Sequence, residues 1–167
     1  MIEKKSNILI LFGDVPLVTL TTLKKLSNNF TKNKYKGSML AFKTKNPFGY
    51  GRVSTKGNKV ESVIEEHIAN PEIKKISLCN SGVLICKYNL LFSFIKKIKR
   101  NNQKKEKYLP DIFAICHKHK ESFNFILCDE NEMLGVNTLE DYIRVEEIYQ
   151  NRLKANLIKK GVNIIEP

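Results

Sequence analysis

A six-residue apolar run near the N-terminus constrains this chain more than any other feature. Residues 7–12 read Asn-Ile-Leu-Ile-Leu-Phe and are followed at once by Gly13 and Asp14. The run lacks the apolar–polar alternation of a strand with one solvated face, and it is far shorter than the ~18–20 residues of a membrane span. It therefore predicts a parallel strand buried on both faces. No membrane partner is expected.

Strands and helices are expected to alternate along the rest of the chain. A Gly-Asn pair at residues 57–58 predicts the turn of a hairpin between residues 51–54 and 59–66. Leu91, Phe94 and Ile98 recur at helical spacing. Further strands are expected at 37–44, 79–87 and 123–128, and helices at 19–29, 88–100, 108–120 and 138–160, with a loop at 100–107. This order predicts the α/β class, with a mixed, mostly parallel sheet and a long C-terminal helix.

The charge of the chain suggests a nucleic-acid partner, but its makeup weakens that interpretation. The net charge is +12, and only four of the 29 basic residues are Arg. Bidentate contacts to phosphates and to guanine edges favour Arg over Lys. We therefore expect no specific nucleic-acid partner. A basic nucleic-acid-binding protein remains the least favoured alternative.

The cysteines are expected to be buried hydrophobic residues rather than metal ligands. They lie at irregular spacings, without a C-x-x-C pair: Cys79, Cys86, Cys116 and Cys128. Cys116, His117 and His119 could begin a soft metal site, but zinc needs four ligands and no second cluster completes the set. A helix end with polar histidines is the favoured interpretation. The N-terminus has no apolar segment of signal-peptide length, so we expect a cytoplasmic protein.

Asp14 is the first candidate functional residue in the chain. It follows the predicted buried strand by two residues, and ligands of open α/β sheets bind beyond the carboxyl ends of their strands. A carboxylate beside a Gly suits a hard cation such as Mg²⁺. Taken alone, Gly13 and Asp14 could equally form an ordinary turn.

Six short motifs in a fixed order strengthen this interpretation. They are Leu11-Phe-Gly-Asp-Val-Pro-Leu17, Phe48-Gly-Tyr-Gly-Arg52, Val63-Ile-Glu-Glu66, Cys79-Asn-Ser-Gly-Val83, Tyr108-Leu-Pro-Asp111 and Leu134-Gly-Val-Asn137. The series resembles the uridylyltransferase domain of the bacterial bifunctional N-acetylglucosamine-1-phosphate uridylyltransferase / glucosamine-1-phosphate N-acetyltransferase. The resemblance runs from about residue 7 to residue 167. It implies a sheet of the nucleotide-diphospho-sugar transferase (Rossmann-like) type.

The resemblance also implies a reaction and a metal. UMP would pass from UTP to N-acetylglucosamine 1-phosphate, giving UDP-N-acetylglucosamine, a precursor of the cell envelope, and pyrophosphate. By their matching motifs, Asp14 and Asn137 are the catalytic residues that would hold Mg²⁺, one through its carboxylate and the other through its amide oxygen. Joining two anions in this way needs alignment and positive charge more than covalent help.

The remaining site residues follow from the same motifs, each with a structural alternative where the residues themselves offer one. Gly13 would lie against the nucleotide, and Tyr108 near the N-acetyl pocket. Gly51 would present its backbone to the sugar phosphate, or only serve a turn. Glu65 would accept from sugar hydroxyls, or lie on a solvated strand edge. Asn80, which together with Asn137 is also expected to bind substrate, would hold the sugar ring or close a turn.

The chain also departs from the family pattern. Its sequence contains no Gly-rich phosphate loop, so the first strands of the nucleotide-binding unit are expected to be missing. Residues 1–160 are expected to be a partial nucleotidyltransferase domain and residues 161–167 the start of a missing second domain. Lys105, Lys107 and Pro110 stand where the family has Gly, Tyr and Thr, and residues 67–68 replace a Lys-Asp pair.

These departures leave an alternative function open. The chain could be an inactive fragment, or a partner subunit that keeps the sugar-phosphate half of the site. An apolar strand without its neighbours leaves an open edge. We therefore expect either self-association or a second chain that supplies the missing half.

Overall fold

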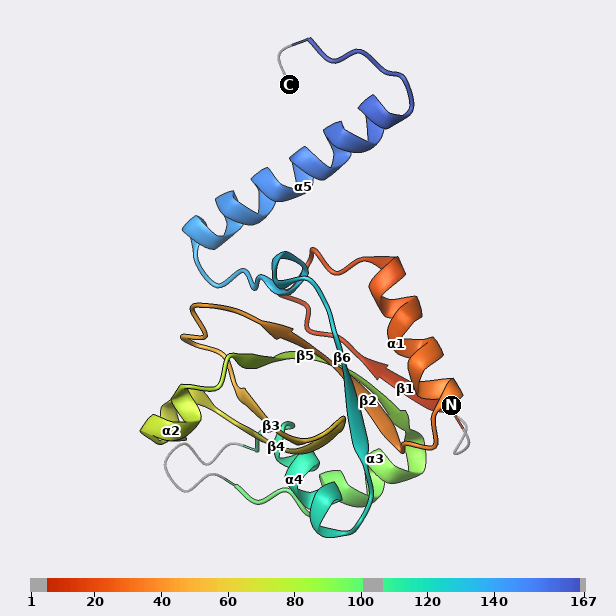
Figure 1. Ribbon diagram of the computed structural model, residues 1–167, viewed down its shortest axis with the longest axis vertical. Helices are drawn as coiled ribbons and strands as arrows, with labels where there is room; N and C mark the ends of the chain where they lie inside the picture. The colour runs from red at the N-terminus through yellow and green to blue at the C-terminus, as the bar shows by residue number, and fades with distance from the viewer. Residues whose placement is uncertain (1–5, 101–106, 166–167) are drawn as a thin grey trace.

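The structure, a computed structural model, describes residues 6–100 and 107–165, which form an α/β fold around a six-stranded sheet (Figure 1). The predicted loop at 100–107 lies almost wholly outside the described residues. The strands are β1 Asn7–Ile10, β2 Gly37–Lys43, β3 Arg52–Lys56, β4 Lys59–Ile64, β5 Leu78–Lys87 and β6 Phe123–Leu127. The helices are α1 Leu20–Lys32, α2 Pro71–Lys74, α3 Tyr88–Ile95, α4 Asp111–Lys118 and α5 Leu139–Lys159, with 3-10 turns at Glu66–Ile68 and Glu130–Met133.

The sheet is mixed, as expected, but the prediction that it is mostly parallel is wrong. Its strand order is β1-β5-β2-β6-β4-β3, and β3 also pairs with β5, so the far end of the sheet curls back on itself. Only β2 and β6 run parallel among the described pairings. β3 and β4 form the predicted hairpin around Gly57 and Asn58, and a two-residue connection can only join antiparallel strands.

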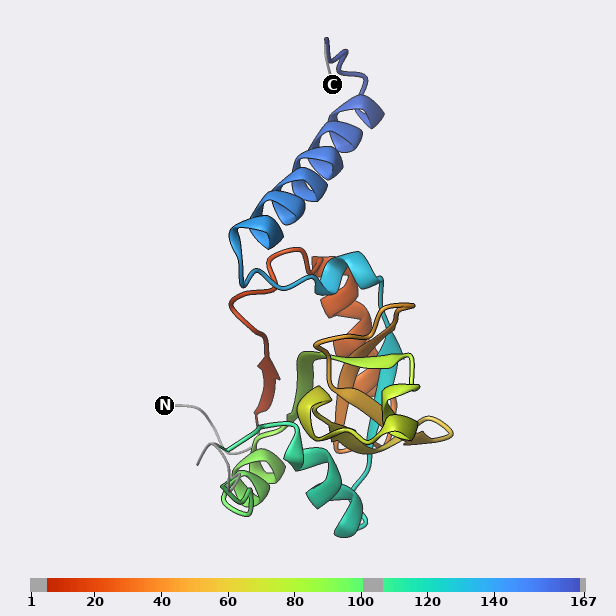
Figure 2. The ribbon, with the colours of Figure 1, turned by 90° about the vertical axis from the view of Figure 1, so that its left-hand side faces the viewer.

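The prediction that the N-terminal run is a buried parallel strand is also wrong. β1 pairs antiparallel with β5, and it has no second neighbour among the described strands (Figure 2). Leu9, Leu11 and Phe12 are therefore 40–44% exposed. The run has the composition of a central strand but occupies an edge, because burial depends on neighbours that the strand's own residues do not specify.

β2 has the double-sided burial that was expected of β1. Met39 and Ala41 enter a core cluster shared with α3 and α4, whereas Leu40 and Phe42 enter a second cluster shared with α1. α1 thus covers one face of the sheet, and α3 and α4 cover the other (Figure 2). The alternation of side chains along β2 thus contributes to two cores, one on each face of the sheet.

Helix positions follow the sequence better than helix lengths do. Thr19 caps α1 as expected, and its side chain accepts from the Thr22 amide. α1 extends beyond the predicted end, while the helices predicted at 88–100 and 108–120 contract to α3 and α4. Leu91 and Phe94 are buried as the spacing predicts. Ile98 is buried too, but it lies past the end of α3.

α5 extends away from the sheet (Figure 1). Val145 is its one buried residue, packed with Leu17 and Leu134. Arg152 ties the helix to the body through a 2.7 Å bond to the Leu17 carbonyl. No helix among the described residues is long and apolar enough to cross a membrane.

Candidate functional site

A hollow of 620 Å³ gathers residues from all six motifs. Its lining includes six of the seven predicted site residues, namely Asp14, Gly51, Glu65, Asn80, Tyr108 and Asn137. Gly13 is not a lining residue, and a Cβ added to it would meet nothing within 4 Å. Five of the six lie in segments that follow β1 and β4, precede β3 and α4, or lead into α5, whereas Asn80 lies within β5.

Asp14 and Asn137 meet at one end of the hollow. The Val136 amide donates to the Asp14 carbonyl at 2.8 Å, which joins the two loops that carry these residues. The position of a Cβ on Gly135 is 3.9 Å from Asp14 Oδ2 and 3.4 Å from Asn137 Nδ2. Both side chains therefore approach the same point, although 123 residues separate them in sequence.

Asp141 shapes the same end of the hollow, and the sequence analysis missed it as a lining residue. Its Oδ2 accepts from the Asn137 amide at 3.0 Å and from the Thr138 amide at 2.9 Å, within the capping box of α5. These donated hydrogen bonds lower the pKa of Asp141. The sequence signal that could have identified Asp141 is its position four residues after Asn137, in the first turn of the predicted helix.

Gly51 and Glu65 meet at the other side of the hollow. A Cβ on Gly51 would lie 3.1 Å from Val63 Cγ1 and 3.4 Å from Glu65 Oε1, so the glycine permits a close approach. The turn conformation belongs instead to Gly49, whose φ is +83°. Gly49, rather than Gly51, therefore has the backbone conformation that a turn requires.

Asn80 lies on a β-bulge. The register between β2 and β5 shifts between the Ala41–Asn80 and Met39–Leu84 pairs, so the bulge begins directly after Asn80. Ser81 fixes the bulge by donating to the Leu40 carbonyl at 2.8 Å. Asn80 Oδ1 accepts from the Gly82 amide at 3.0 Å, so the expected turn-closing role is present while the residue also lines the hollow.

Gly82 is a second residue whose role the sequence analysis missed. Its φ is +78°, and a Cβ there would overlap the ring of Phe12. The absence of a side chain lets Phe12 cross the bulge and form one wall of the hollow. The positive φ and the close approach both require glycine at this position.

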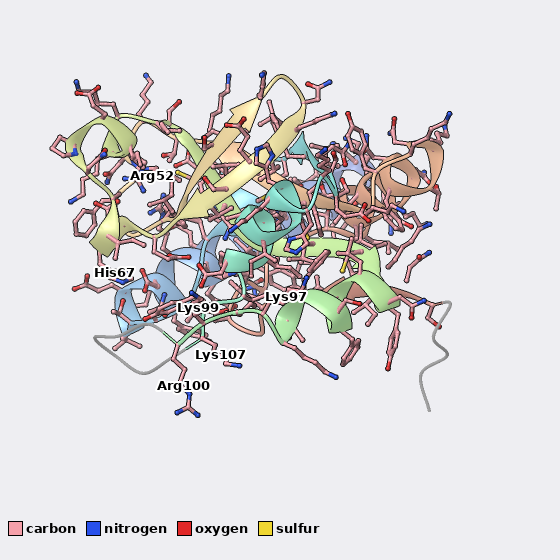
Figure 3. All side chains as sticks on the ribbon, turned by 90° about the horizontal axis from the view of Figure 1, so that it is seen from below. Arg52, His67, Lys97, Lys99, Arg100 and Lys107 are labelled. Atoms are coloured by element: carbon pink, nitrogen blue, oxygen red, sulfur yellow. The ribbon has the colours of Figure 1, made fainter. Side chains whose placement is uncertain are left out.

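Lys107, Tyr108 and Pro110 close the hollow near Glu65. The ring of Tyr108 lies 5.9 Å from that of His67. Lys107 lies on the same side of the molecule as Lys99 and Arg100 in the view of Figure 3. Of the residues that depart from the family pattern, Lys107 and Pro110 thus lie in the hollow, while Lys105 lies outside the described residues.

Carboxylates outnumber cations in the hollow. Asp14, Glu65 and Asp141 face a single described cation, Lys107, although the whole chain is strongly basic. Burial raises the pKa of Glu65, the nearby Asp111 carboxylate raises it further, and His67 opposes the shift. Burial likewise raises the pKa of Asp111. The site thus holds an excess of negative charge that a cation would relieve.

The donor atoms at Asp14 and Asn137 fit magnesium. No group of three or more His, Cys, Asp or Glu in the described part of the chain could hold a metal by itself. Mg²⁺ is commonly bound by one or two carboxylates together with water and substrate phosphates, so a full protein cage is not required. Among the described residues, no hydrogen bond or ion pair engages the Asp14 carboxylate, whereas Asp141 is committed to its helix cap.

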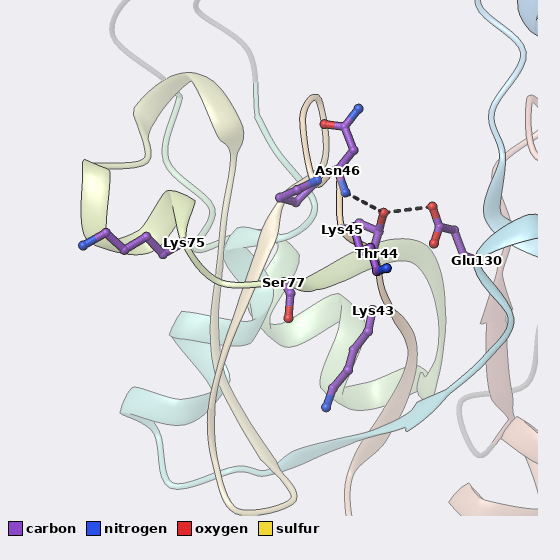
Figure 4. A pocket seen from close by; sticks show the side chains of 8 residues that line it. Lys43, Thr44, Lys45, Asn46, Lys75, Ser77 and Glu130 are labelled. Carbon is purple, nitrogen blue, oxygen red and sulfur yellow. Dashed lines mark hydrogen bonds between the residues drawn. The ribbon is translucent and has the colours of Figure 1, made fainter.

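A second hollow, of 810 Å³, is lined in part by the loop that carries Asn46 and Pro47 (Figure 4). Thr44 in its lining makes two hydrogen bonds: its hydroxyl donates to the Glu130 carboxylate at 2.8 Å and accepts from the Asn46 amide at 3.1 Å. The side chains of Lys43 and Lys75 extend in different directions (Figure 4). None of the predicted site residues lines this hollow, so the first one is the candidate site.

Comparison with solved structures identifies the class of fold. Apo-UDP-glucose pyrophosphorylase aligns with a TM-score of 0.67 at 13% identity, over 89% of this chain and 55% of that one. A putative glucose-1-phosphate thymidylyltransferase from Bacillus anthracis aligns with a TM-score of 0.54 at 16% identity, over 96% and 54%. The fold is thus a nucleotidyltransferase-like α/β fold, shared with these two proteins. No family model matches the chain.

Sequence comparison identifies the relatives more narrowly. The bifunctional protein GlmU of Campylobacter fetus is 40% identical over 154 residues, which cover 92% of this chain and 34% of that protein. GlmU of Thermosipho africanus is 37% identical over 167 residues, covering 99% and 36%. The chain is homologous to part of the GlmU proteins, the family that its motifs indicated. It spans about a third of the length of these relatives.

Proposed function

We propose that this chain carries the sugar-phosphate and metal side of a sugar-1-phosphate nucleotidyltransferase. The reaction is transfer of UMP from UTP to N-acetylglucosamine 1-phosphate, with release of pyrophosphate. The observation that carries the proposal is the convergence of six separate motifs on one hollow in a homologue of GlmU. The UDP-glucose pyrophosphorylase that shares the fold supports the same class of reaction.

The residues of the hollow divide the work of binding. The sugar phosphate would lie across Gly51, which lines the hollow beside Glu65 and has no side chain to block it. Glu65 would accept from sugar hydroxyls, Asn80 would donate its free amide N–H groups to the ring, and Tyr108 would flank the N-acetyl group. Alignment of the two reacting phosphates lowers the barrier because most of the catalytic task is positioning.

Asp14 and Asn137 would hold Mg²⁺ through a carboxylate and an amide oxygen. When bound, the metal supplies positive charge that offsets the repulsion between the sugar phosphate and the triphosphate. The excess of carboxylates in the hollow supports this assignment, because two phosphorylated substrates need a cation that the described side chains, apart from Lys107, do not provide.

A second function is supported by the open edge of β1. Leu9 on β1 is exposed, as are Leu11 and Phe12 just after it, and Phe12 also lines the hollow. A further strand would pair with this open edge. In this alternative the chain is an inactive piece or a subunit, and another chain supplies the nucleotide-binding half. Binding of sugar phosphate would then persist without turnover.

Pyrophosphate release separates these functions. The full chain is mixed with UTP, N-acetylglucosamine 1-phosphate and Mg²⁺, and sugar-phosphate binding is measured in parallel by calorimetry. Release that disappears in Asp14→Asn but persists in Glu72→Gln, a distant exposed carboxylate, supports the enzyme. Binding without release supports the subunit. A chain that shows no sugar-phosphate binding and no pyrophosphate release overturns both functions.

A further inference from the structure

An ion pair between the buried Arg52 and the partly buried Glu66 adjoins the Gly51–Glu65 side of the hollow. Arg52 is 2% exposed, and its guanidinium donates to the Tyr50 carbonyl and pairs with the Glu66 carboxylate. The other Glu66 oxygen lies 3.8 Å from the exposed ammonium of Lys74, on α2. Figure 3 shows Arg52 on the side of the molecule where the segment around α2 lies.

Each member of this pair directly follows a residue of the hollow. Arg52 follows Gly51, and Glu66 follows Glu65. Gly51 and Glu65 line the hollow, whereas Arg52 and Glu66 do not. The pair therefore joins the start of β3 to the 3-10 turn that follows β4, without lining the hollow.

Gly51 and Glu65, which directly precede Arg52 and Glu66 in sequence, lie within contact distance of each other. Both carboxylate oxygens of Glu65 lie 3.4–3.5 Å from the position of a Cβ on Gly51. The Gly51 carbonyl also accepts a hydrogen bond from the Asn80 backbone amide at 2.8 Å. The position of Gly51 is therefore coupled to that of Asn80 beside the β5 bulge. Movement of Arg52 relative to Glu66 would separate Gly51 from Glu65 and loosen Asn80.

We infer that Arg52 and Glu66 are a positioning pair that fixes the Glu65 carboxylate against the Gly51 backbone. The identity of the ligand that uses this geometry, a sugar 1-phosphate, rests on the proposed function, whereas the geometry itself does not. Neither residue touches the hollow, so both act through their neighbours.

Stability alone does not explain an ion pair at this place. Desolvation offsets much of the attraction between buried charges, and an apolar pair of similar volume is often at least as stable. Arg52 Nε has no hydrogen-bond partner among the described residues, so the burial is not fully compensated. What the ion pair adds is a directional link, because the guanidinium holds the Tyr50 carbonyl and the Glu66 carboxylate at once.

The ligand-free test is an acid titration followed at the Gly51 amide by ¹H–¹⁵N NMR. In the wild type, that resonance follows the ionisation of Glu65, with a midpoint above the ordinary value of 4.5. Arg52→Met and the milder Arg52→Lys reduce the amplitude of this response by more than half. Lys74→Met removes the outer cation of Glu66 and leaves the response unchanged, which makes it the matched control.

The double variant R52M/E66M separates positioning from stability. It replaces the charges by apolar side chains, so its melting temperature returns toward the wild-type value while the Gly51 response stays reduced. Its affinity for N-acetylglucosamine 1-phosphate falls about tenfold or more, while Mn²⁺ binding at Asp14 is unchanged. A folded double variant with the wild-type Gly51 response overturns the positioning role.

The outcomes also distinguish this inference from the proposed function. If wild-type protein binds no sugar phosphate, the proposed function fails, and the Gly51 titration alone still decides the positioning role. If Arg52→Met does not fold, Arg52→Lys and the double variant give the same measurement. A Gly51 resonance that does not respond to Glu65 in the wild type also overturns the inference.

Discussion

Glu65 occupies an environment that opposes its ionisation. Burial and the Asp111 carboxylate raise its pKa, and only His67 acts in the other direction. A buried carboxylate that lowers the stability of the ligand-free fold is expected at a site that binds a ligand through its hydroxyl groups. At the residue scale, therefore, the proposed binding role and the stability of the fold make opposite demands on Glu65.

The sign of the resulting pH dependence follows from linkage. A carboxyl group whose folded pKa lies above its unfolded value of 4.5 stabilises the fold fully below that value. This stability is lost as the pH rises through the folded pKa. Glu65→Gln removes the effect, so the variant is expected to melt at a higher temperature than the wild type at neutral pH and to show a weaker pH dependence above 4.5.

Thermal melts of both proteins across this pH range check the prediction, with sugar-phosphate affinity measured alongside. Glu61→Gln, a carboxylate on the same hairpin outside the hollow, is the control. A variant that melts below the wild type at neutral pH contradicts the account, as does one that binds sugar phosphate equally well.

The elements show which parts of the fold the sequence contains. The Thr19 and Thr138 caps, the Gly57–Asn58 hairpin and the apolar spacing of α3 are local signals, and the structure confirms them. Strand direction and burial are not local. β1 and β2 have similar apolar composition, yet one is an edge strand and the other is central, because their neighbours differ.

The open edge of β1 leads to a prediction about association. Leu9 is 40% exposed and points away from the core cluster that receives Ile8 and Ile10. A charge at this position discourages edge-to-edge pairing without disturbing that cluster. Leu9→Lys is therefore expected to reduce self-association of the isolated chain, as measured by sedimentation velocity over a concentration series.

Leu139→Lys is the matched control, since Leu139 is 73% exposed on α5, away from the sheet edge. The same added charge there leaves association unchanged if the edge is responsible. A wild-type chain that stays monomeric at high concentration removes the basis of the prediction.

At the scale of the whole molecule, the site was more predictable than the sheet that carries it. The motifs predicted that Asp14 and Asn137 would approach each other, and the structure brings them to one point. Gly82 was missed because its close approach to Phe12 joins segments far apart in sequence, and the Arg52–Glu66 pair because it forms only when the hairpin closes. Asp141 was missed although its contacts with Asn137 and Thr138 are local. The predicted boundary at residues 160–161 and the binding roles of the site residues remain predictions.

The central claim is that the hollow beneath Asp14 and Asn137 binds a sugar 1-phosphate with a divalent cation. The most direct test is a ¹H–¹⁵N NMR titration of the full chain with N-acetylglucosamine 1-phosphate and Mg²⁺. The account predicts that the amide resonances of Gly51, Asn80, Gly135 and Asn137 shift together, and that those of Lys43–Asn46 in the second hollow do not. Shifts confined to the second hollow, or none at saturating ligand, would contradict it.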